Sequence, residues 1–519
     1  MIKVLFLHPI TDSIFGRQSI PIAYVSSMIK SLGHSCDIFD TTFYDTSILL
    51  DGNLQSGSEK LIKLKQFKDW SSSDLGFTKF EINIFKALQD KIDHYKPDII
   101  TFSLWGSHLH AEGEYYAFSN GLKLINKVDT KNAKIFVGGT IPSNNPEKIL
   151  RNTKVDYIVK GETELVFKEI IENFREFDPT KIPNLNYLDK NNEFISNPLM
   201  PLIDPLDQLP DVNFDIYNPN SFKRPFHGKI VNMVDFELSR GCWYRCTFCL
   251  SPFQREKTYK KAKNFRREKS IEKIIREISS IKNRHNLDMI RFQDESFNSI
   301  KEDKLKDLSK DYKKYVDLPF IIEATINTST KKRIDYLSDM GCINVGLGIE
   351  SGSQFIRDKV IDKPKFTNDQ AVETIKYYKK KNINVTVYNI LGFPHETESH
   401  IKETIHLNHK AKPNHALISY FQPWDGTKLK DIAIKEGYLD DNKTLEEMTL
   451  GQQNNSSLKL GISDNLLSYY YDNFVYYVYL NKLIWPLIKF KEKFSFLENI
   501  TRKLLSIVLK FNQKIIKIK

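Results

Sequence analysis

The stretch SRGCWYRCTFC, residues 239–249, decides how the rest of this sequence is interpreted. It places Cys242, Cys246 and Cys249 on one short segment, with three and then two residues between them. Three thiolates on one loop can bind three irons of a cubane iron–sulfur cluster and leave the fourth iron open for chemistry. The other two cysteines, Cys36 and Cys342, stand alone, so the spacing predicts a single cluster.

A structural zinc site is the alternative interpretation of these cysteines. It would need a fourth ligand, for which His227 and His285 are candidates. Zinc sites of this kind usually pair two separated Cys-x2-Cys units, and the sequence has no second pair. The spacing therefore favours the iron–sulfur cluster.

The cysteines follow the first strand of an alternating strand–helix series that runs from about residue 229 to 432. Helices are predicted between the strands, for example over 271–281 and 369–380. Six such units predict a partial parallel barrel, with chemistry at the carboxyl ends of its strands. The predicted strands are 234–239, 289–294, 319–325, 343–350, 384–392 and 416–423.

A separate alternating series fills the first ~175 residues. A doubly wound parallel sheet is predicted, which binds ligands beyond the carboxyl ends of its strands. The segment 45–78 is a long insertion, either a lid or a loose loop, and 176–226 is a Pro-, Asn- and Asp-rich linker. The predicted strands are 4–9, 98–105, 134–140 and 155–161.

Composition sets further limits on the class of protein. Five cysteines in 519 residues exclude a disulfide-rich secreted scaffold. The first ten residues, MIKVLFLHPI, predict a strand and not a signal peptide. No uncharged apolar run reaches ~18 residues, so no spanning helix is predicted and a cytoplasmic location is expected. The net charge is +11, of which residues 482–519 carry +8 (ten Lys or Arg, two Glu), so the basic balance does not indicate nucleic-acid binding.

The region 433–519 is predicted to be helical, and two of its features have two interpretations each. A tyrosine-rich patch over 469–479 is either part of the core or an apolar wall for substrate. The tail has an apolar stripe bordered by basic residues, which either contacts a membrane surface or packs on the barrel. The stripe consists of Leu497, Ile500, Leu504, Ile507, Phe511 and Ile515, and the basic residues are Arg502, Lys503, Lys510, Lys514 and Lys517.

The cysteine motif, with Phe248 before its last cysteine, resembles that of the radical S-adenosylmethionine superfamily. Residues 1–175 are similar to the cobalamin-binding domain that precedes this core in one large subfamily. The resemblance implies an α/β chain with a Rossmann-like domain at 1–175, a linker at 176–226, a radical core at 227–432 and a helical region at 433–519. Further matching segments are FRREKSIEKIIREI (265–278), IRFQDESFN (290–298), GCINVGLGIESGS (341–353), NILGFPHETE (389–398) and YFQPWDGTKL (420–429).

Residue roles in the core follow from this resemblance. Cys242, Cys246 and Cys249 would ligate a [4Fe–4S] cluster whose open iron chelates the amino and carboxylate groups of S-adenosylmethionine. Asp294 and Glu295 would contact the methionyl ammonium, Glu350 the ribose hydroxyls, and Gly392 and Phe393 the adenine, with Phe248 beside the cluster. Solvated strand-end carboxylates are the alternative for Asp294 and Glu350. His395 stands where the family usually has a small residue, as a local variation or as a proton donor.

The resemblance also implies cobalamin contacts at Ser103, Leu104, Gly138, Gly139 and Glu162, at the carboxyl ends of the predicted strands. The Asp-x-His-x-x-Gly motif that supplies an axial histidine in other cobalamin proteins is missing. His108 and His110 have a similar local pattern but follow the wrong strand. Cobalamin is therefore expected to bind without a protein histidine on cobalt, or the domain is vestigial.

The function implied is reductive cleavage of S-adenosylmethionine to a 5′-deoxyadenosyl radical, followed by methylation of an unactivated carbon from cobalamin. Cyclisation, oxidation or rearrangement without methyl transfer is the alternative within the family, and a non-catalytic iron–sulfur or zinc redox sensor is the alternative of another class. Methylthiolation needs a second cluster, for which the cysteines are missing. The expected partners are a small-molecule or lipid-like substrate and an electron donor such as flavodoxin or ferredoxin, with possible membrane contact by the tail.

Overall fold

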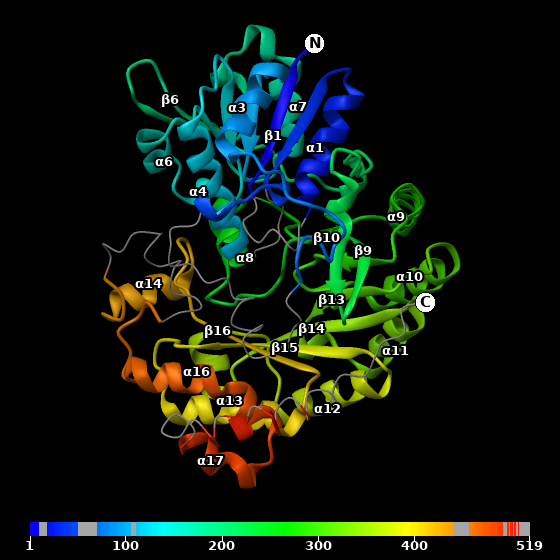
Figure 1. The fold of residues 1–519 in the computed structure, drawn as a ribbon, viewed down its shortest axis with the longest axis vertical. Helices are drawn as coiled ribbons and strands as arrows, with labels where there is room; N and C mark the ends of the chain where they lie inside the picture. The colour runs from blue at the N-terminus through cyan, green and yellow to red at the C-terminus, as the bar shows by residue number, and fades with distance from the viewer. Residues whose placement is uncertain are drawn as a thin grey trace. The chain divides into compact units, whose positions relative to one another are not determined.

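The computed structural model describes most of the chain, and these residues fall into two compact units (Figure 1). One unit comprises Met1–Leu54, Trp70–Gly241 and Gln254–Gln293, and the other comprises Gln55–Asp69, Cys242–Phe253 and Asp294–Lys519. The described residues are 1–9, 18–49, 70–104, 111–260, 262–440, 456–490, 496–497, 499–501, 503–504 and 507, and the side chains of 111–117 are left aside. Residues 50–69 of the predicted insertion therefore lie outside the described part.

The first unit contains a seven-stranded sheet in the order β2-β1-β3-β4-β5-β6-β7. The first five of these strands are parallel, and β6 and β7 are antiparallel. The switch in strand order lies between β1 and β3, which is where doubly wound sheets bind ligands. The bounds are β1 Lys3–His8, β2 Ser35–Asp40, β3 Ile99–Phe102, β4 Lys134–Val137, β5 Tyr157–Val159, β6 Leu185–Leu188 and β7 Phe194–Ser196.

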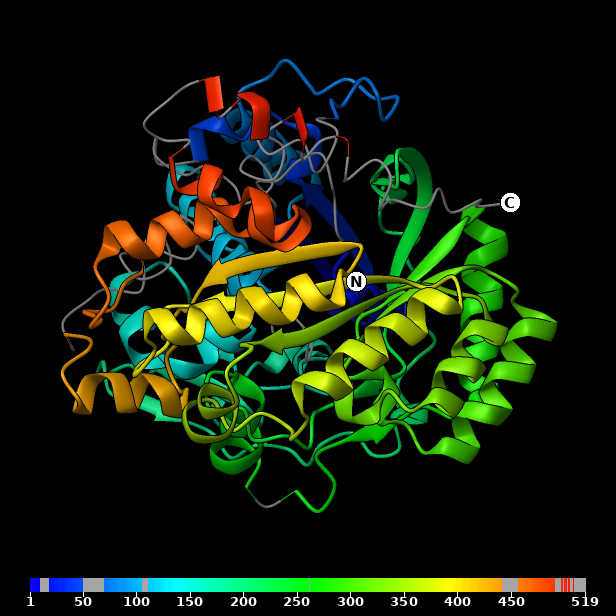
Figure 2. The ribbon, with the colours of Figure 1, turned by 90° about the horizontal axis from the view of Figure 1, so that it is seen from below.

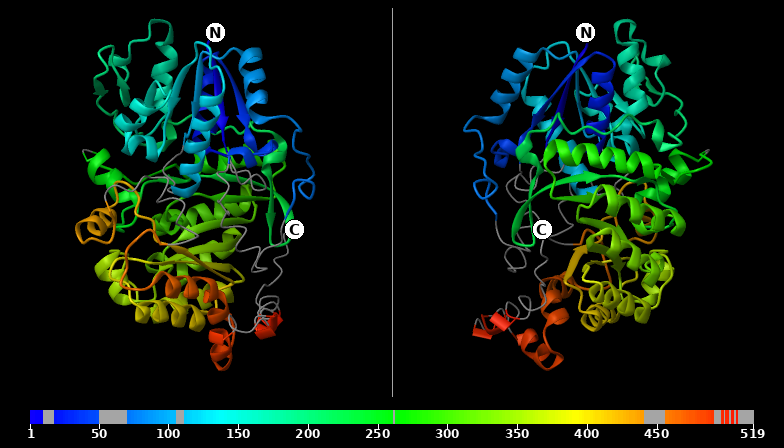
Figure 3. Two further views of the ribbon diagram at one scale, coloured as in Figure 1. Left: turned by 60° about the vertical axis from the view of Figure 1, so that its left-hand side comes forward. Right: turned by 90° about the vertical axis from the view of Figure 1, so that its right-hand side faces the viewer.

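Helices cover both faces of this sheet, as Figures 1 and 3 show. α1 contacts α7 on one face, and α3 contacts α4 on the other. Since both faces are covered, β1 and β3 are continuous apolar runs rather than alternating ones. The bounds are α1 Ile20–Ser31, α3 Ile84–Tyr95, α4 Ala111–Lys127, α5 Thr140–Asn144, α6 Pro146–Asn152 and α7 Glu164–Glu172.

The stretch interpreted as a linker contributes regular structure to this unit. β6 and β7 form a hairpin that extends the sheet beyond residue 175. Farther along, Lys273 Nζ donates to the Leu209 carbonyl (2.8 Å), and the Val212 amide donates to Glu277 (3.0 Å). The segment 209–212 is therefore bound to helix α9, Ile271–His285.

The second series of strands supplies six parallel strands, as the sequence predicts. β9 (Lys229–Phe236) and β12 (Met289–Phe292) pair in the first unit, where β8 (Lys223–Phe226) adds an antiparallel edge. In the second unit the strands follow the order β13-β14-β15-β16. Their bounds are β13 Phe320–Ala324, β14 Cys342–Glu350, β15 Asn384–Leu391 and β16 His415–Tyr420.

Helices follow these strands in turn in the second unit. α10 contacts α11, α11 contacts α12, and α12 contacts α13. Figure 2 shows α12 and α13 in yellow, lying beside one another, with α16 in orange next to α13. The bounds are α10 Glu302–Tyr315, α11 Lys331–Met340, α12 Asn368–Lys380, α13 Glu398–Ala411, α14 Lys428–Lys435, α16 Asp464–Tyr479 and α17 Trp485–Phe490.

The tyrosine-rich patch belongs to the core of the second unit. Tyr470, Tyr471 and Tyr477 are buried in one apolar cluster with Leu391 of β15. The ring of Tyr471 stacks on Tyr420, with centroids 4.4 Å apart. Of the two interpretations of this patch, the structure supports the core.

None of the helices that the structure describes is long and apolar enough to cross a membrane.

Candidate functional site

The middle of the cysteine loop is bound firmly to two other segments of the second unit. The Thr247 amide donates to the Ile361 carbonyl (3.0 Å), and its hydroxyl donates to the Val360 carbonyl (2.8 Å). The Leu429 amide donates to the Thr247 carbonyl (2.9 Å). A tight turn follows, in which the Cys249 amide donates to the Cys246 carbonyl. These bonds fix the loop between its second and third cysteines.

The three thiols of this loop influence one another electrostatically. Cys246 is buried, while Cys242 and Cys249 are half-buried. Burial raises the pKa of Cys249, and the nearby thiolates of Cys246 and Cys242 raise it further. Three thiolates here would repel each other in a place with little water, so a multivalent cation would stabilise them. This donor set fits an iron–sulfur cluster, although no three such groups already meet at metal-binding distance within the described residues.

Of the two isolated cysteines, Cys342 is buried and Cys36 is half-buried. Burial raises the pKa of Cys36 to about 11, and it raises the pKa of Cys342 as well. The Cys342 thiol lies 3.4 Å from the Asn344 carbonyl within β14. A candidate fourth ligand for zinc is also engaged elsewhere, because His285 stacks on Phe222 and lies 3.2 Å from Asp215.

Glu350 occupies a strained position at the end of β14. Its φ is +64°, in the left-handed region, and the register shifts between Gly348 and Glu350. Its carboxylate pairs with Lys363 Nζ at 2.9 Å, and both side chains are less than 10% exposed. A Cβ on Gly348 would lie only 2.4 Å from Glu350 Oε1, so the glycine makes room for this carboxylate. Non-glycine residues held this way cluster at binding sites.

Lys363 connects this carboxylate to the cysteine loop. Its Nζ lies 6.0 Å from the centre of the Phe248 ring. Burial acts to lower the pKa of Lys363, but Glu350 and then Cys246 outweigh this and raise it. Burial raises the pKa of the Cys246 thiol, and the same ammonium offsets only part of that rise. Sequence reasoning missed Lys363, which lies thirteen residues past Glu350 with no motif of its own.

Aromatic contacts join the cysteine loop to the loop after β15. The rings of Phe248 and Phe393 lie 6.1 Å apart, and those of Phe393 and Phe421 lie 5.4 Å apart. Phe393 is fully buried, and Gly392 before it has φ +85°, which a side chain would strain. The predicted adenine-loop residues therefore lie beside the predicted cluster loop.

Glu396 is a second residue that sequence reasoning missed. Its carboxylate accepts hydrogen bonds from the amides of Gly392 (2.5 Å) and Phe393. Its other oxygen, Oε1, is buried and has no hydrogen-bond partner among the residues that the structure describes. Burial raises the pKa of Glu396 to about 8 despite the two amide donors. Its place in the segment NILGFPHETE was the available signal.

His395 precedes Glu396 with φ +62°, which explains why a small residue is usual there. Its Nε2 lies 2.8 Å from Glu436, and its Nδ1 lies 3.2 Å from the Tyr438 hydroxyl. These contacts hold the ring in place and support the local-variation interpretation.

Asp294 and Glu295 open the loop after β12. Asp294 is buried, and Glu295 is close enough to raise the pKa of Cys249. A carboxylate close to Cys249 is suited to receive an ammonium group.

The predicted cobalamin contacts lie at carboxyl ends of strands in the first unit. Ser103 is buried at φ +58°, and its hydroxyl has no partner among the described residues. The Leu104 carbonyl accepts from the Ser19 hydroxyl at 2.6 Å. A strained residue with an unsatisfied buried hydroxyl is a reasonable contact for a ligand. Trp105, His108 and His110 lie outside the described residues.

The paired glycines have different surroundings. A Cβ on Gly138 would stand 3.0 Å from Thr163 and 3.1 Å from Leu104, so this glycine allows close packing inside the domain. Gly139 caps α5 with φ 96° and ψ 174°, a backbone conformation nearly restricted to glycine. Gly139 also borders a pocket that includes Gly161 and Tyr259. Gly139 is therefore the better candidate for close approach of a cofactor.

Glu162 also lines this pocket, and its carboxylate is held by two arginines. Its carboxylate accepts two hydrogen bonds from Arg267 (2.7 and 3.0 Å) and lies 3.5 Å from Arg240. Its amide donates to the Tyr259 hydroxyl at 2.8 Å. Although burial raises its pKa, Arg240 and then Arg267 bring the pKa below its ordinary value. The carboxylate is thus held as an anion by arginines.

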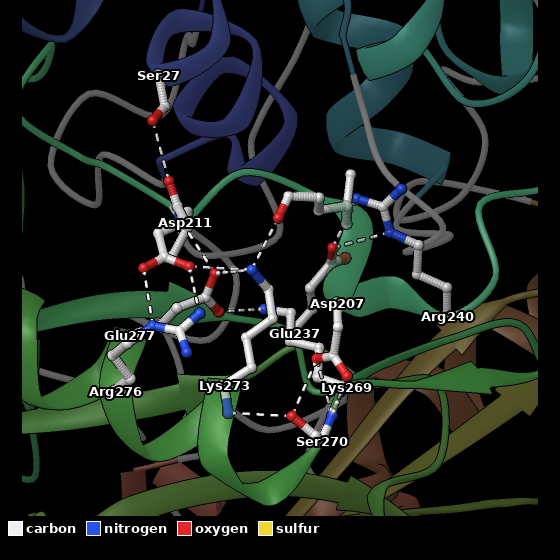
Figure 4. A network of polar contacts seen from close by, with 12 residues as sticks. Ser27, Asp207, Asp211, Glu237, Arg240, Lys269, Ser270, Lys273, Arg276 and Glu277 are labelled. Carbon is white, nitrogen blue, oxygen red and sulfur yellow. Dashed lines mark hydrogen bonds and ion pairs between the residues drawn. The ribbon is translucent and has the colours of Figure 1, made fainter. Parts of the chain in front are cut away.

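Arg240 belongs to a buried network of charges in the first unit (Figure 4). It pairs with Glu164 (2.6 Å) and Glu237 (2.7 Å), and each of the three is at most 2% exposed. Lys269 and Glu277, also fully buried, pair at 2.8 Å. Arg240 ends β10, Ser239–Arg240, two residues before Cys242. The network therefore holds the chain at the entry to the cysteine loop.

Two family models match the chain. One, described as the radical SAM superfamily, matches residues 236–407, and the other, described as the B12 binding domain, matches residues 63–171. Domains of the first kind use a [4Fe–4S] cluster and S-adenosylmethionine, and the second kind binds cobalamin.

Two relatives and one solved structure extend these matches. An uncharacterised methyltransferase of Pyrococcus horikoshii is 28% identical over 68% of this chain and 73% of its own. Cytidylyl-2-hydroxyethylphosphonate methyltransferase of Streptomyces wedmorensis is 22% identical over 87% of this chain and 85% of its own. The cobalamin-dependent S-adenosylmethionine radical enzyme OxsB, solved with aqua-cobalamin and S-adenosylmethionine, has a TM-score of 0.64 at 16% identity, over 97% of this chain and 72% of that one.

The fold class and the three cofactors predicted from the sequence are confirmed. The cysteine-loop chemistry, the doubly wound domain and both family matches agree. The chain belongs to the radical S-adenosylmethionine enzymes that carry an N-terminal cobalamin-binding domain.

Proposed function

We propose that this enzyme methylates an unactivated carbon of a small-molecule or lipid-like substrate. When bound, the cluster supplies the electron that cleaves S-adenosylmethionine, and cobalamin supplies the methyl group. The main support for the proposal is that one chain contains both cofactor-binding domains. Two of its relatives are also named as methyltransferases.

The residues of the second unit have distinct parts in this proposal. Cys242, Cys246 and Cys249 hold the cluster, and Thr247 between them fixes their loop. Glu350, ion-paired with Lys363, receives the ribose hydroxyls. These contacts orient the nucleoside before the bond breaks.

Other side chains of this unit bind and shield the nucleotide. Phe248 and Phe393 present apolar surface to the adenine and exclude water. Gly392 lets the loop approach, and Asp294 and Glu295 receive the methionyl ammonium.

In the first unit we assign Ser103, Leu104 and Gly139 to cobalamin contact, while Gly138 keeps the strand ends closely packed. The domains inferred from the sequence, 1–175 and 227–432, enclose the segments 63–171 and 236–407 that the family models match. A flavodoxin or ferredoxin as electron donor and a cytoplasmic location complete the proposal.

Product analysis under anaerobic conditions tests the proposal. Methylation at carbon consumes two molecules of S-adenosylmethionine, one giving 5′-deoxyadenosine and methionine and the other giving S-adenosylhomocysteine. The two nucleoside products should therefore form in about equal amounts. Cys246→Ala should abolish 5′-deoxyadenosine, whereas Cys342→Ala should retain it because Cys342 packs within β14.

Two outcomes would redirect the proposal. Formation of 5′-deoxyadenosine without S-adenosylhomocysteine would show cyclisation, oxidation or rearrangement instead of methylation. Absence of both products from protein with a full cluster would point to a redox sensor.

A further inference from the structure

An exposed apolar surface lies at the C-terminal end of the second unit. It consists of Leu483, Leu487 and Phe490, whose side chains are 87%, 39% and 50% exposed. We name these three residues the 483–490 surface. They lie on or just before the short helix α17.

The opposite side of this segment is anchored, so these three side chains are held outward. Ile488 is fully buried in the cluster built around α16, and Ile484 and Trp485 pack against it. The Trp485 ring stacks on His406 of α13, with centroids 5.4 Å apart and planes at 18°. The segment therefore has one face in the core and one apolar face in solvent.

Exposed apolar side chains continue beyond the 483–490 surface. Phe496, Ile500 and Ile507 are also exposed, whereas Leu504 packs against the core cluster. Over the described parts of the chain, fourteen large apolar side chains are exposed, and six of them fall between 483 and 507. Single exposed apolar residues scattered over a surface are normal, but a group of them in one segment indicates an interaction site.

The charge of this region identifies the partner. Lys482 and Lys489 border the 483–490 surface and are both exposed. Residues 482–519 carry a net charge of +8. A second copy of the chain would bring this charge against itself, whereas an anionic lipid surface attracts it. Bulky apolar residues bordered by lysines suit the boundary between headgroups and acyl chains.

We propose that the 483–490 surface binds the headgroup layer of an anionic membrane, with the three apolar side chains inserted and the lysines paired with lipid phosphates. This inference names a partner beyond the proposed function and does not depend on it. It also offers a route to a membrane-held substrate.

Vesicle flotation of the full-length holoenzyme tests the proposal. We expect flotation with phosphatidylcholine vesicles containing about one third phosphatidylglycerol, and about tenfold less with phosphatidylcholine alone. About 0.5 M salt should weaken it strongly, because salt screens surface charge. The triple variant Leu483→Ser, Leu487→Ser, Phe490→Ser should lose about tenfold in bound fraction.

A matched control distinguishes binding through this surface from nonspecific adsorption to vesicles. Phe355 is 48% exposed on another part of the unit, so Phe355→Ser should float like the parent, unlike Phe490→Ser. If the triple variant fails to fold, Lys482→Glu with Lys489→Glu tests the charge at two exposed positions. Equal flotation of parent and variants overturns the proposal, and so does a dimer in solution that the triple variant dissociates.

Formation of 5′-deoxyadenosine in the absence of vesicles is a separate readout. It should be unchanged in the triple variant, because none of the three residues belongs to the cofactor site. A failure of membrane binding is thereby distinguished from a failure of the proposed chemistry.

Discussion

At the scale of single residues, we expect the stability of the fold to be sensitive to mutation of the buried pair Glu350–Lys363. Lys363→Met would leave the Glu350 carboxylate buried and unpaired, because no more than 9% of either side chain is exposed. Removing one partner of a buried pair costs about 3–5 kcal/mol of unfolding free energy. Urea unfolding should show this loss for Lys363→Met and a smaller loss for Lys363→Arg.

The double variant Glu350→Gln, Lys363→Met is the control for this pair. It removes both charges and should recover much of the loss. A single Lys363→Met loss below about 1 kcal/mol would contradict the buried pairing.

The raised pKa of Glu396 leads us to expect that the stability of the fold depends on pH. Its folded pKa is raised to about 8, whereas the ordinary pKa of a glutamate, as in the unfolded chain, is 4.5. Between these values the folded chain holds a proton that the unfolded chain has lost, so stability falls as pH rises from about 4.5 to 8 and levels off above. Glu396→Gln keeps the shape without the proton. Its unfolding free energy should therefore vary less over this window, and an unchanged slope would count against the assignment.

The sequence could identify the carboxylate of Glu350 but not its partner. Glu350 ends a strand that the alternation of apolar residues predicts, inside a motif shared with a known family. Lys363 lies past a π-helical turn, Ile356–Val360, and approaches Glu350 only through the fold of that turn. Glu396 was missed for a similar reason, because its burial comes from packing and not from its local pattern.

At the scale of elements, strands within apolar runs were predictable, whereas strands in polar or Pro-rich stretches were not. β1, β3, β14 and β15 match predicted runs to within a few residues. β2 escaped prediction because SCDIFD is a half-exposed edge strand with little apolar continuity. The hairpin β6–β7 lies in a Pro- and Asn-rich stretch whose composition resembles a linker, and only pairing with β5 reveals it.

The short strand β10 depends on its buried arginine. Arg240→Met would leave Glu164 and Glu237 buried near one another without their cation. We expect a loss of about 3–5 kcal/mol in unfolding free energy, measured by urea titration. The control is Arg276→Met, since Arg276 pairs with Asp211 while 52% exposed, and should lose at most about 1 kcal/mol. Equal losses in the two variants would refute a special role for β10.

At the scale of the whole molecule, sequence reasoning established the class of chemistry and the order of domains, because each domain carries its own local motif. Its assignment of Glu162 to cobalamin contact stays a prediction, but it did not foresee that Arg267 and Arg240, from distant parts of the chain, hold this carboxylate. Such pairings depend on which segments meet, which no spacing rule specifies. The unusual backbone conformation of Gly139 is local, so the sequence could signal it, and its contact with cobalamin stays a prediction.

The two cofactors should be separable by mutation, because their proposed contacts lie in different units of the chain. Gly139→Val would force a side chain into φ 96° beside the pocket at the ends of β4 and β5. We expect retained cobalt to fall at least about fivefold, while about four irons per chain remain. Cys246→Ala should show the reverse, and metal analysis of anaerobically reconstituted protein measures both. Gly33→Val is the control, since Gly33 has φ +77° with open space around it; it should keep both metals. Equal loss of cobalt from Gly33→Val and Gly139→Val would show that backbone strain alone, and not contact with cobalamin, explains the result.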